Sequence, residues 1–137
     1  MIGISLREVE TVEELPAEYS LPAASTGYAY LSIQLTVTRI EGVHLVNVLG
    51  FGEERPVLHD SDGQSYTLGF GTFRGVKFQD PTNITSPSEL VEGAEGILVF
   101  EIPKDQEPAD LNLVYTYQET WDDSSPEQRG EMTVRLD

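Results

Sequence analysis

Residues 31–38 read Leu-Ser-Ile-Gln-Leu-Thr-Val-Thr, with an apolar residue at every odd position and a polar residue at every even position. Side chains of a β-strand alternate between its two faces, so this strict period of two predicts a strand with one core face and one wet face. Leu31, Ile33, Leu35 and Val37 are therefore expected in the core. The alternation indicates a protein whose fold is built from half-buried strands.

Other short segments with strand character lie on both sides of this stretch. They are residues 2–10, 43–49, 56–59, 65–68, 76–78, 97–102, 111–117 and 132–136. Seven to nine short strands without a helical pattern predict an all-β antiparallel sandwich or barrel. The alternating positions give an expected core of Leu31, Ile33, Leu35, Val37, Leu98, Phe100, Leu111, Leu113, Val134 and Leu136.

The length of 137 residues predicts a single domain spanning residues 1–137. Within it, residues 11–26 are expected to form a connecting arm, because Pro16 and Pro22 interrupt any helical period. Residues 69–89 contain several glycines and prolines. We expect them to form an irregular loop with one short strand near residues 76–78.

The charge balance narrows the function classes. The chain has 24 acidic and 8 basic residues and a net charge of −16, so a simple nucleic-acid binder is excluded. Only Lys77 and Lys104 are lysines, and an acidic, lysine-poor surface is typical of proteins from salt-loving organisms. The alternative is an ordinary acidic exported domain kept soluble by like charge. No apolar run reaches the roughly 18 residues of a membrane helix, so we expect no direct membrane insertion.

Catalytic and metal-binding motifs are weak in this sequence. Cysteine is absent, which excludes disulfides and thiolate chemistry. His44 and His59 are the only histidines, and no Gly-x-Ser-x-Gly elbow accompanies them, so we expect no enzyme and no cofactor. Asp60-Ser61-Asp62-Gly63 resembles the opening of a calcium loop, but its twelfth position is Gly71 instead of a glutamate. A tight hairpin turn without a metal site is therefore favoured.

Tyr28 and Tyr30 share the parity of Ser32, which places them on the outer face of their strand. Two neighbouring outward tyrosines need cover, and the favoured interpretation is that the arm at residues 11–26 provides it. The alternative is an exposed aromatic patch, which would indicate a ligand or partner surface. The apolar residues of the arm that would cover the tyrosines are Leu15, Tyr19 and Leu21.

Two further aromatic residues complete a candidate binding surface. It comprises Tyr28, Tyr30, Phe73 and Trp121. Trp121 opens an acidic segment and either packs over the end of the sandwich or serves as an exposed anchor for a partner. Asn83 begins an Asn-Ile-Thr triplet, a candidate glycosylation site if the chain is exported.

Three fragments, in this order, resemble a known family. They are residues 27–38, residues 58–66 and residues 90–115, within which Gly-Ile-Leu-Val-Phe-Glu-Ile-Pro-Lys-Asp at 96–105 is the most specific part. They resemble an uncharacterised family of immunoglobulin-like β-sandwich ectodomains of bacterial and archaeal secreted proteins and lipoproteins, related to the mycobacterial immunoprotective extracellular antigen. The resemblance implies an immunoglobulin-like sandwich of seven to nine strands in an extracellular or cell-surface setting, and it carries over no catalytic residues.

The expected function follows from these observations together. Met1 leads directly into the first strand, so the chain is either cytoplasmic or begins after a removed export signal, and the resemblance favours the second. We expect a non-enzymatic cell-surface or secreted domain that acts as a protein-interaction or structural module toward an unidentified protein or surface partner. The alternative is a small-ligand or carbohydrate-binding domain, which requires the four aromatic residues to converge in a cleft.

Overall fold

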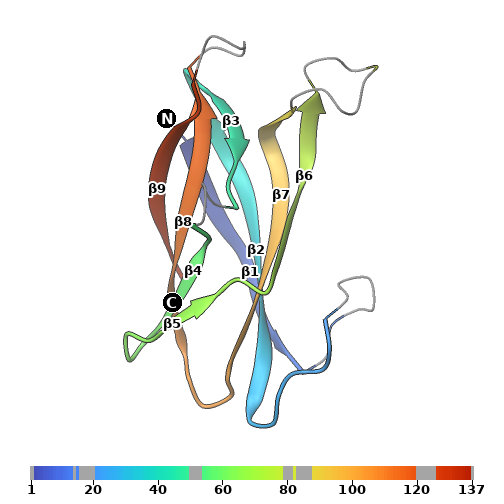
Figure 1. Ribbon diagram of the computed structural model, residues 1–137, viewed down its shortest axis with the longest axis vertical. Coiled ribbons are helices and arrows are strands. Elements are labelled where there is room, and N and C mark those ends of the chain that lie inside the picture. The colour runs from blue at the N-terminus through green and yellow to red at the C-terminus, as the bar shows by residue number, and fades with distance from the viewer. Residues whose placement is uncertain are drawn as a thin grey trace.

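The computed structural model of the chain describes residues 2–13, 15, 21–49, 54–78, 82, 88–119 and 126–136. These residues form nine antiparallel strands and no helix, so the all-β sandwich expected from the sequence is confirmed (Figure 1). The strands are β1 (Ile2–Val12), β2 (Tyr28–Ile40), β3 (His44–Asn47), β4 (Val57–Asp60), β5 (Ser65–Thr67), β6 (Phe70–Phe78), β7 (Ser88–Pro103), β8 (Pro108–Gln118) and β9 (Gln128–Arg135).

The strands lie in two layers. In the first layer β1, β2, β7 and β6 pair in that order, and every pair is antiparallel. In the second layer β8 is central, with β9 on one side and β4 followed by β5 on the other, while β3 pairs with the far half of β8. Leu45 of β3 also pairs with Leu90 of β7, so the two layers join through hydrogen bonds at one corner.

The core between the layers contains the residues that the alternation predicted, together with others. All ten expected core residues are buried except Leu136, which is partly buried and packs against the same cluster. A second, smaller cluster contains Val37, Leu45 and Leu90. Phe73 packs against both clusters and so links the two parts of the core.

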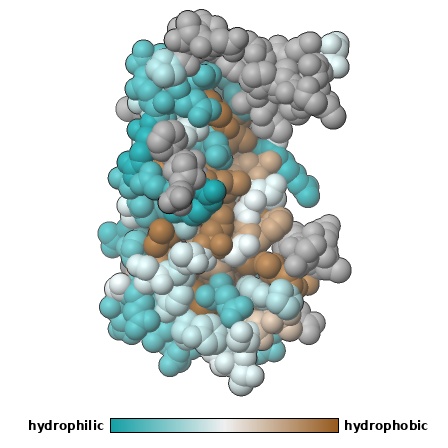
Figure 2. Space-filling view, viewed as in Figure 1, coloured by the Kyte–Doolittle hydropathy of each residue, from teal (hydrophilic) through white to brown (hydrophobic). Residues whose placement is uncertain are grey.

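The core reaches the surface along one side of the molecule. Figure 2 shows hydrophobic surface gathered in a band along the middle of this face, with hydrophilic surface around it. The partly buried residues Leu49, Leu68 and Phe73 pack against the margin of the core. Among the described residues, Tyr28 is the large hydrophobic residue that is substantially exposed.

The prediction of an irregular loop across residues 69–89 is wrong for its first half, because residues 70–78 form β6. The glycines that suggested a loop are needed for close packing between strands. A side chain at Gly71 would come within 2.8 Å of Leu98, and one at Gly75 would come within 2.9 Å of the Ala94 backbone. Gly75 has a φ of 97° and lies at a register shift, where residues 91–94 of β7 stand opposite this single residue of β6.

Other predicted boundaries also differ from those observed. β1 extends two residues beyond its predicted end, and β7 begins at Ser88 and not at residue 97. β3 covers only His44–Asn47 of the predicted strand at 43–49. β7 is longer because its first part pairs with β6, the strand that precedes it in the chain, and with β3, which lies far from it in sequence.

The expectation of a wet outer face on β2 and β7 is wrong at one end of the first layer. Ser32 is only 7% exposed and its cross-strand partner Val99 is fully buried, although both have the outward parity. Tyr30, one pair further along, is only 3% exposed. We call these three residues the covered half of the outer face.

Candidate functional site

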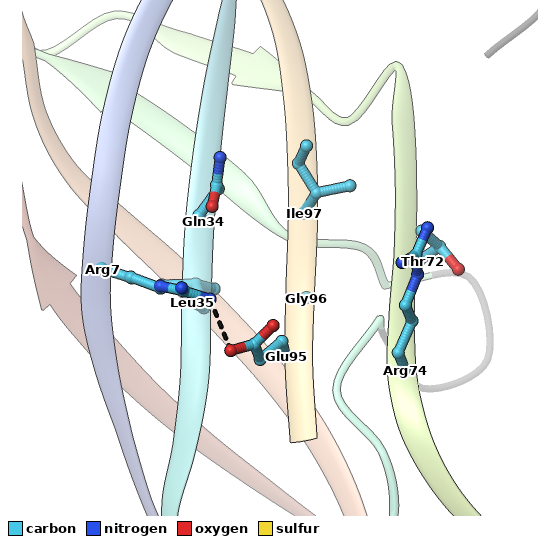
Figure 3. A pocket seen from close by; sticks show the side chains of 8 residues that line it. All are labelled: Arg7, Gln34, Leu35, Thr72, Arg74, Glu95, Gly96 and Ile97. Atoms are coloured by element: carbon cyan, nitrogen blue, oxygen red, sulfur yellow. Dashed lines mark hydrogen bonds and ion pairs between the residues drawn. The ribbon is translucent and has the colours of Figure 1, made fainter. Parts of the chain in front are cut away.

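The rest of that outer face carries a groove of about 210 Å³, shown in Figure 3. It crosses all four strands of the first layer, and the cross-strand pairs align its side chains in rows. Gln34, Ile97 and Thr72 form one row, and Glu95 with Arg74 forms part of the next. We call this region the open half of the outer face. The residues that line the groove are Arg7, Gln34, Leu35, Thr72, Arg74, Glu95, Gly96 and Ile97.

A β-bulge places Arg7 at the groove. The pairing of β1 with β2 shifts register between Leu6 and Glu8, so Arg7 is an extra residue without a cross-strand partner. Leu6 still packs against the core, while Arg7 is about half exposed. Bulges re-aim side chains in this way, and here the effect is to bring a guanidinium from an edge strand to the groove.

The carboxylate of Glu95 pairs with Arg7 and not with its own cross-strand neighbour. Arg7 donates a hydrogen bond to Glu95 and forms an ion pair with it, and both side chains are about half exposed. Arg74 lies directly opposite Glu95 in the β6–β7 pairing. Figure 3 shows Glu95 turned toward Arg7, with the Arg74 side chain running along β6 in the direction of Thr72.

Arg74 is therefore the basic side chain without a partner in the part of the chain that the structure describes. The other described arginines and Lys104 all interact with an acidic side chain, a backbone carbonyl or another group. This is unexpected in a protein with 24 acidic and 8 basic residues. The available guanidinium is a result of the local geometry, because the nearest carboxylate is already engaged.

The groove combines groups that recognise a carboxylate. Arg74 offers a planar fork of N–H donors, which matches the two oxygens of a carboxylate. The Thr72 hydroxyl and the Gln34 side-chain amide add donors beside it, and Ile97 contributes an apolar floor. No histidine lines the groove, and its one carboxylate, that of Glu95, is paired with Arg7.

The aromatic residues singled out from the sequence do not form one surface in the described residues. Tyr28 is 40% exposed and Tyr30 is buried. Phe73 packs into the core on the opposite face of the layer. Trp121 and Asn83 lie outside the described residues, so their predicted roles stay predictions.

The arm covers Tyr30. Its hydroxyl donates a 2.6 Å hydrogen bond to the backbone carbonyl of Pro22, and Leu21 lies in the same region. Burial raises the pKa of Tyr30, and the neighbouring carboxylate of Glu101 adds to this effect. Tyr30 thus belongs to the covered half, as the favoured interpretation of the sequence expected. The same interpretation is wrong for Tyr28, which is 40% exposed.

Asp60 organises the hairpin between β4 and β5. One carboxylate oxygen accepts hydrogen bonds from the backbone N–H groups of Asp62 and Gln64, and the other accepts one of 2.8 Å from the Tyr66 hydroxyl. Burial alone would raise the pKa of Asp60, but these hydrogen bonds outweigh it and hold the pKa below its usual value. Burial and Asp60 together raise the pKa of Tyr66 to about 12. Gly63 supplies the positive φ, as the hairpin prediction required.

The two histidines lie at separate places and pair with carboxylates. His44 Nδ1 is 2.7 Å from Glu89, and His59 Nδ1 is 2.9 Å from Asp110. Within the described residues no group of three or more histidine or acidic side chains is arranged to hold a metal ion. The same residues include no helix with the length and apolarity of a membrane span.

Sequence reasoning missed Arg7 and Arg74. A signal for Arg7 was present, because the apolar residues of the first strand fall at Ile4 and Leu6 and then at Val9, and this break in the period of two marks the bulge. Arg74 was hidden inside the segment read as a loop. No sequence pattern indicates that Glu95 would pair with Arg7 instead of Arg74.

Comparisons with known proteins add little to this description. No protein-family model matches the chain, and no curated protein shows significant similarity to it. Among solved structures, the chain is similar to a β-sandwich protein from Clostridium difficile 630 that is described as uncharacterized. The identity is 12%, the match covers 99% of this chain and 85% of that one, and the TM-score is 0.42. No function follows from a similarity at this level.

Proposed function

We propose that this chain is a non-enzymatic, cell-surface or secreted interaction module that binds its partner through the open half of the outer face. The observation that carries the proposal is Arg74, a guanidinium without a partner among the described residues, in a groove with an apolar floor. A site on paired strands holds its side chains more precisely than a site on a loop, which favours recognition.

The pairing order supports the module interpretation. The first layer has the order β1-β2-β7-β6, and the second has β8 between β9 and the β3–β4 region. In chain order this corresponds to the ABED and CFG sheets of immunoglobulin-type sandwiches, which commonly serve as cell-surface domains. The resemblance of residues 27–117 to an ectodomain family favours the same setting.

A peptide library displayed on phage tests the proposal. Ligands selected on the wild-type chain should lose binding to Arg74→Glu and keep binding to Arg135→Glu. Arg135 is a matched control because it is an exposed arginine on another strand, β9, outside the groove. A library that yields no ligand, or ligands that bind Arg74→Glu as well as wild type, would contradict the proposal.

One observation favours carbohydrate binding as a second candidate function. Tyr28 is 40% exposed and lines a groove of about 540 Å³ together with Glu13 and Lys104, which form an ion pair. An exposed aromatic face beside charged hydrogen-bonding groups can stack on a sugar ring. A glycan array probed with wild type and Tyr28→Ala tests it, and sugars that bind both proteins equally would exclude this site.

A further inference from the structure

The edge of the first layer beside the groove is formed by β6. β6 pairs with β7 on one side, and no other strand of the described chain pairs with it on the other. Figure 1 shows β6 at the outer margin of the molecule. The backbone of an edge strand offers a row of donors and acceptors that an added strand can pair with.

The first part of β6 is regular and its side chains alternate cleanly. From Gly71 to Arg74 the register with β7 is continuous, and the register shift between Arg74 and Val76 ends this run. Phe73 points into the core, whereas Thr72 and Arg74 line the groove on the outer face. A strand added along this run would therefore place every second side chain beside Thr72 and Arg74.

The positive charge of Arg74 indicates which residue the added strand should have in the position that faces it. Opposite charges in directly facing positions stabilise a strand pair, and like charges destabilise it. Inside the protein the facing position is Glu95, which pairs with Arg7. An incoming aspartate or glutamate would find the guanidinium of Arg74 available and the Thr72 hydroxyl next to it.

We propose that β6 takes up an extended segment of a partner polypeptide by antiparallel strand addition, with a carboxylate of that segment paired to Arg74. This inference rests on the proposed function and specifies its partner. A basic residue on an edge strand also protects against edge-to-edge aggregation. If Arg74 only protected the edge against aggregation, no acidic strand would bind there. The protective role and the binding role can therefore be distinguished by experiment.

The test uses three short synthetic peptides of threonine and valine that differ only in a central glutamate, glutamine or lysine. They are titrated into nitrogen-labelled full chain and followed by amide chemical shifts and hydrogen exchange. We expect the amides from Gly71 to Arg74 to shift and every second one, those whose N–H groups point away from β7, to exchange more slowly. The glutamate peptide should bind at least about tenfold more tightly. Arg74→Glu should reverse this preference toward a lysine peptide, while Arg135→Glu should leave it unchanged.

Several results would overturn the inference. They are equal affinity for the glutamate and glutamine peptides, changes confined to another strand, and absence of binding. Free glucuronate, titrated as a carboxylate that cannot form a strand, would also overturn it by binding at Arg74 without slower exchange in β6. If library ligands depend on Arg74 but are not acidic strands, the inference fails and the proposed function stands. If no ligand depends on Arg74, both fail.

Discussion

The two halves of the outer face of the first layer have the same alternation but different environments. In the covered half, Ser32 and Val99 are at most 7% exposed. In the open half, Gln34 and Ile97 are partly exposed and Thr72 is exposed, and all three line the groove. The odd or even position of a residue in its strand therefore determines which face its side chain occupies. Whether that face is exposed to solvent depends on whether other parts of the chain cover it.

The covered half is tied to the arm by a specific contact. The hydroxyl of Tyr30 donates to the carbonyl of Pro22, and proline cannot donate a backbone hydrogen bond in return. A buried hydroxyl with a partner costs little, whereas one without a partner is expensive. The contact with the arm thus gives Tyr30 a structural role, whereas the groove of the open half is left uncovered among the described residues.

The largest expected loss of stability follows from a substitution on the inner face, and the other losses can be compared with it. Phe100 is fully buried and belongs to the main core cluster. Phe100→Ala should lower the free energy of unfolding by about 3–5 kcal/mol, the usual range for emptying a buried aromatic site. Urea denaturation measures it, and a loss below about 1 kcal/mol would show that this part of the core is not packed as described.

A matched pair of substitutions on β7 compares the two halves directly. Val99→Thr should cost roughly 1–3 kcal/mol, because it buries a hydroxyl in the covered half. Ile97→Thr, two residues away in the open half, should cost less than about 1 kcal/mol because the hydroxyl can reach water. The same urea denaturation decides it, and equal costs at the two positions would remove the distinction between the halves.

The pH dependence tests the polar border of the covered half. Tyr66 lines the same region as Tyr30, and its pKa is raised to about 12 from its ordinary value of 10.0. A raised pKa means that the neutral phenol is favoured in the folded state. The stabilisation is therefore complete below pH 10, and it is lost as the pH rises toward about 12. Thermal melts of wild type and Tyr66→Phe across this range should converge, and parallel curves would contradict this.

At acid pH the β4–β5 hairpin, which contains Asp60 and Tyr66, should lose stability as the pH falls. The pKa of Asp60 is held below its ordinary value of 3.8, so the charged carboxylate stabilises the fold. That stabilisation is present above this value and is lost as the pH falls below it. Asp60→Asn should lower the melting temperature at neutral pH and flatten its decline in acid. A variant that declines as steeply as wild type would show that other carboxylates control acid unfolding.

The smallest expected effect is that of salt concentration on the melting temperature. Repulsion among the carboxylates behind the net charge of −16 should be screened as salt rises, and most of the gain should come before the Debye length reaches ~3 Å near 1 M. Sodium chloride and sodium sulfate at matched ionic strength should act alike if screening dominates. A melting temperature that stays flat from dilute buffer to molar salt would remove the support for a salt-adapted protein.

Sequence alone was sufficient where local alternation and the core coincide. The alternation in Leu31 to Val37 and in the later strands predicted both the sandwich and about half of its buried core. It failed at β6, because Gly71 and Gly75 look like loop residues until the strands they approach are known. It also failed at Val99, which is fully buried although its parity points outward. It failed again at Arg74, which has no partner among the described residues because Glu95 pairs with Arg7 of another strand.

The central claim is that the covered half of the outer face supports the fold and the open half binds the partner. Measuring both unfolding and peptide binding for Val99→Thr and Arg74→Glu tests it most directly. We predict that Val99→Thr loses roughly 1–3 kcal/mol of stability and retains its preference for the glutamate peptide. Arg74→Glu should unfold within about 0.5 kcal/mol of wild type and lose that preference. If Arg74→Glu instead destabilises the fold and leaves peptide binding unchanged, the assignment of the open half to binding is contradicted.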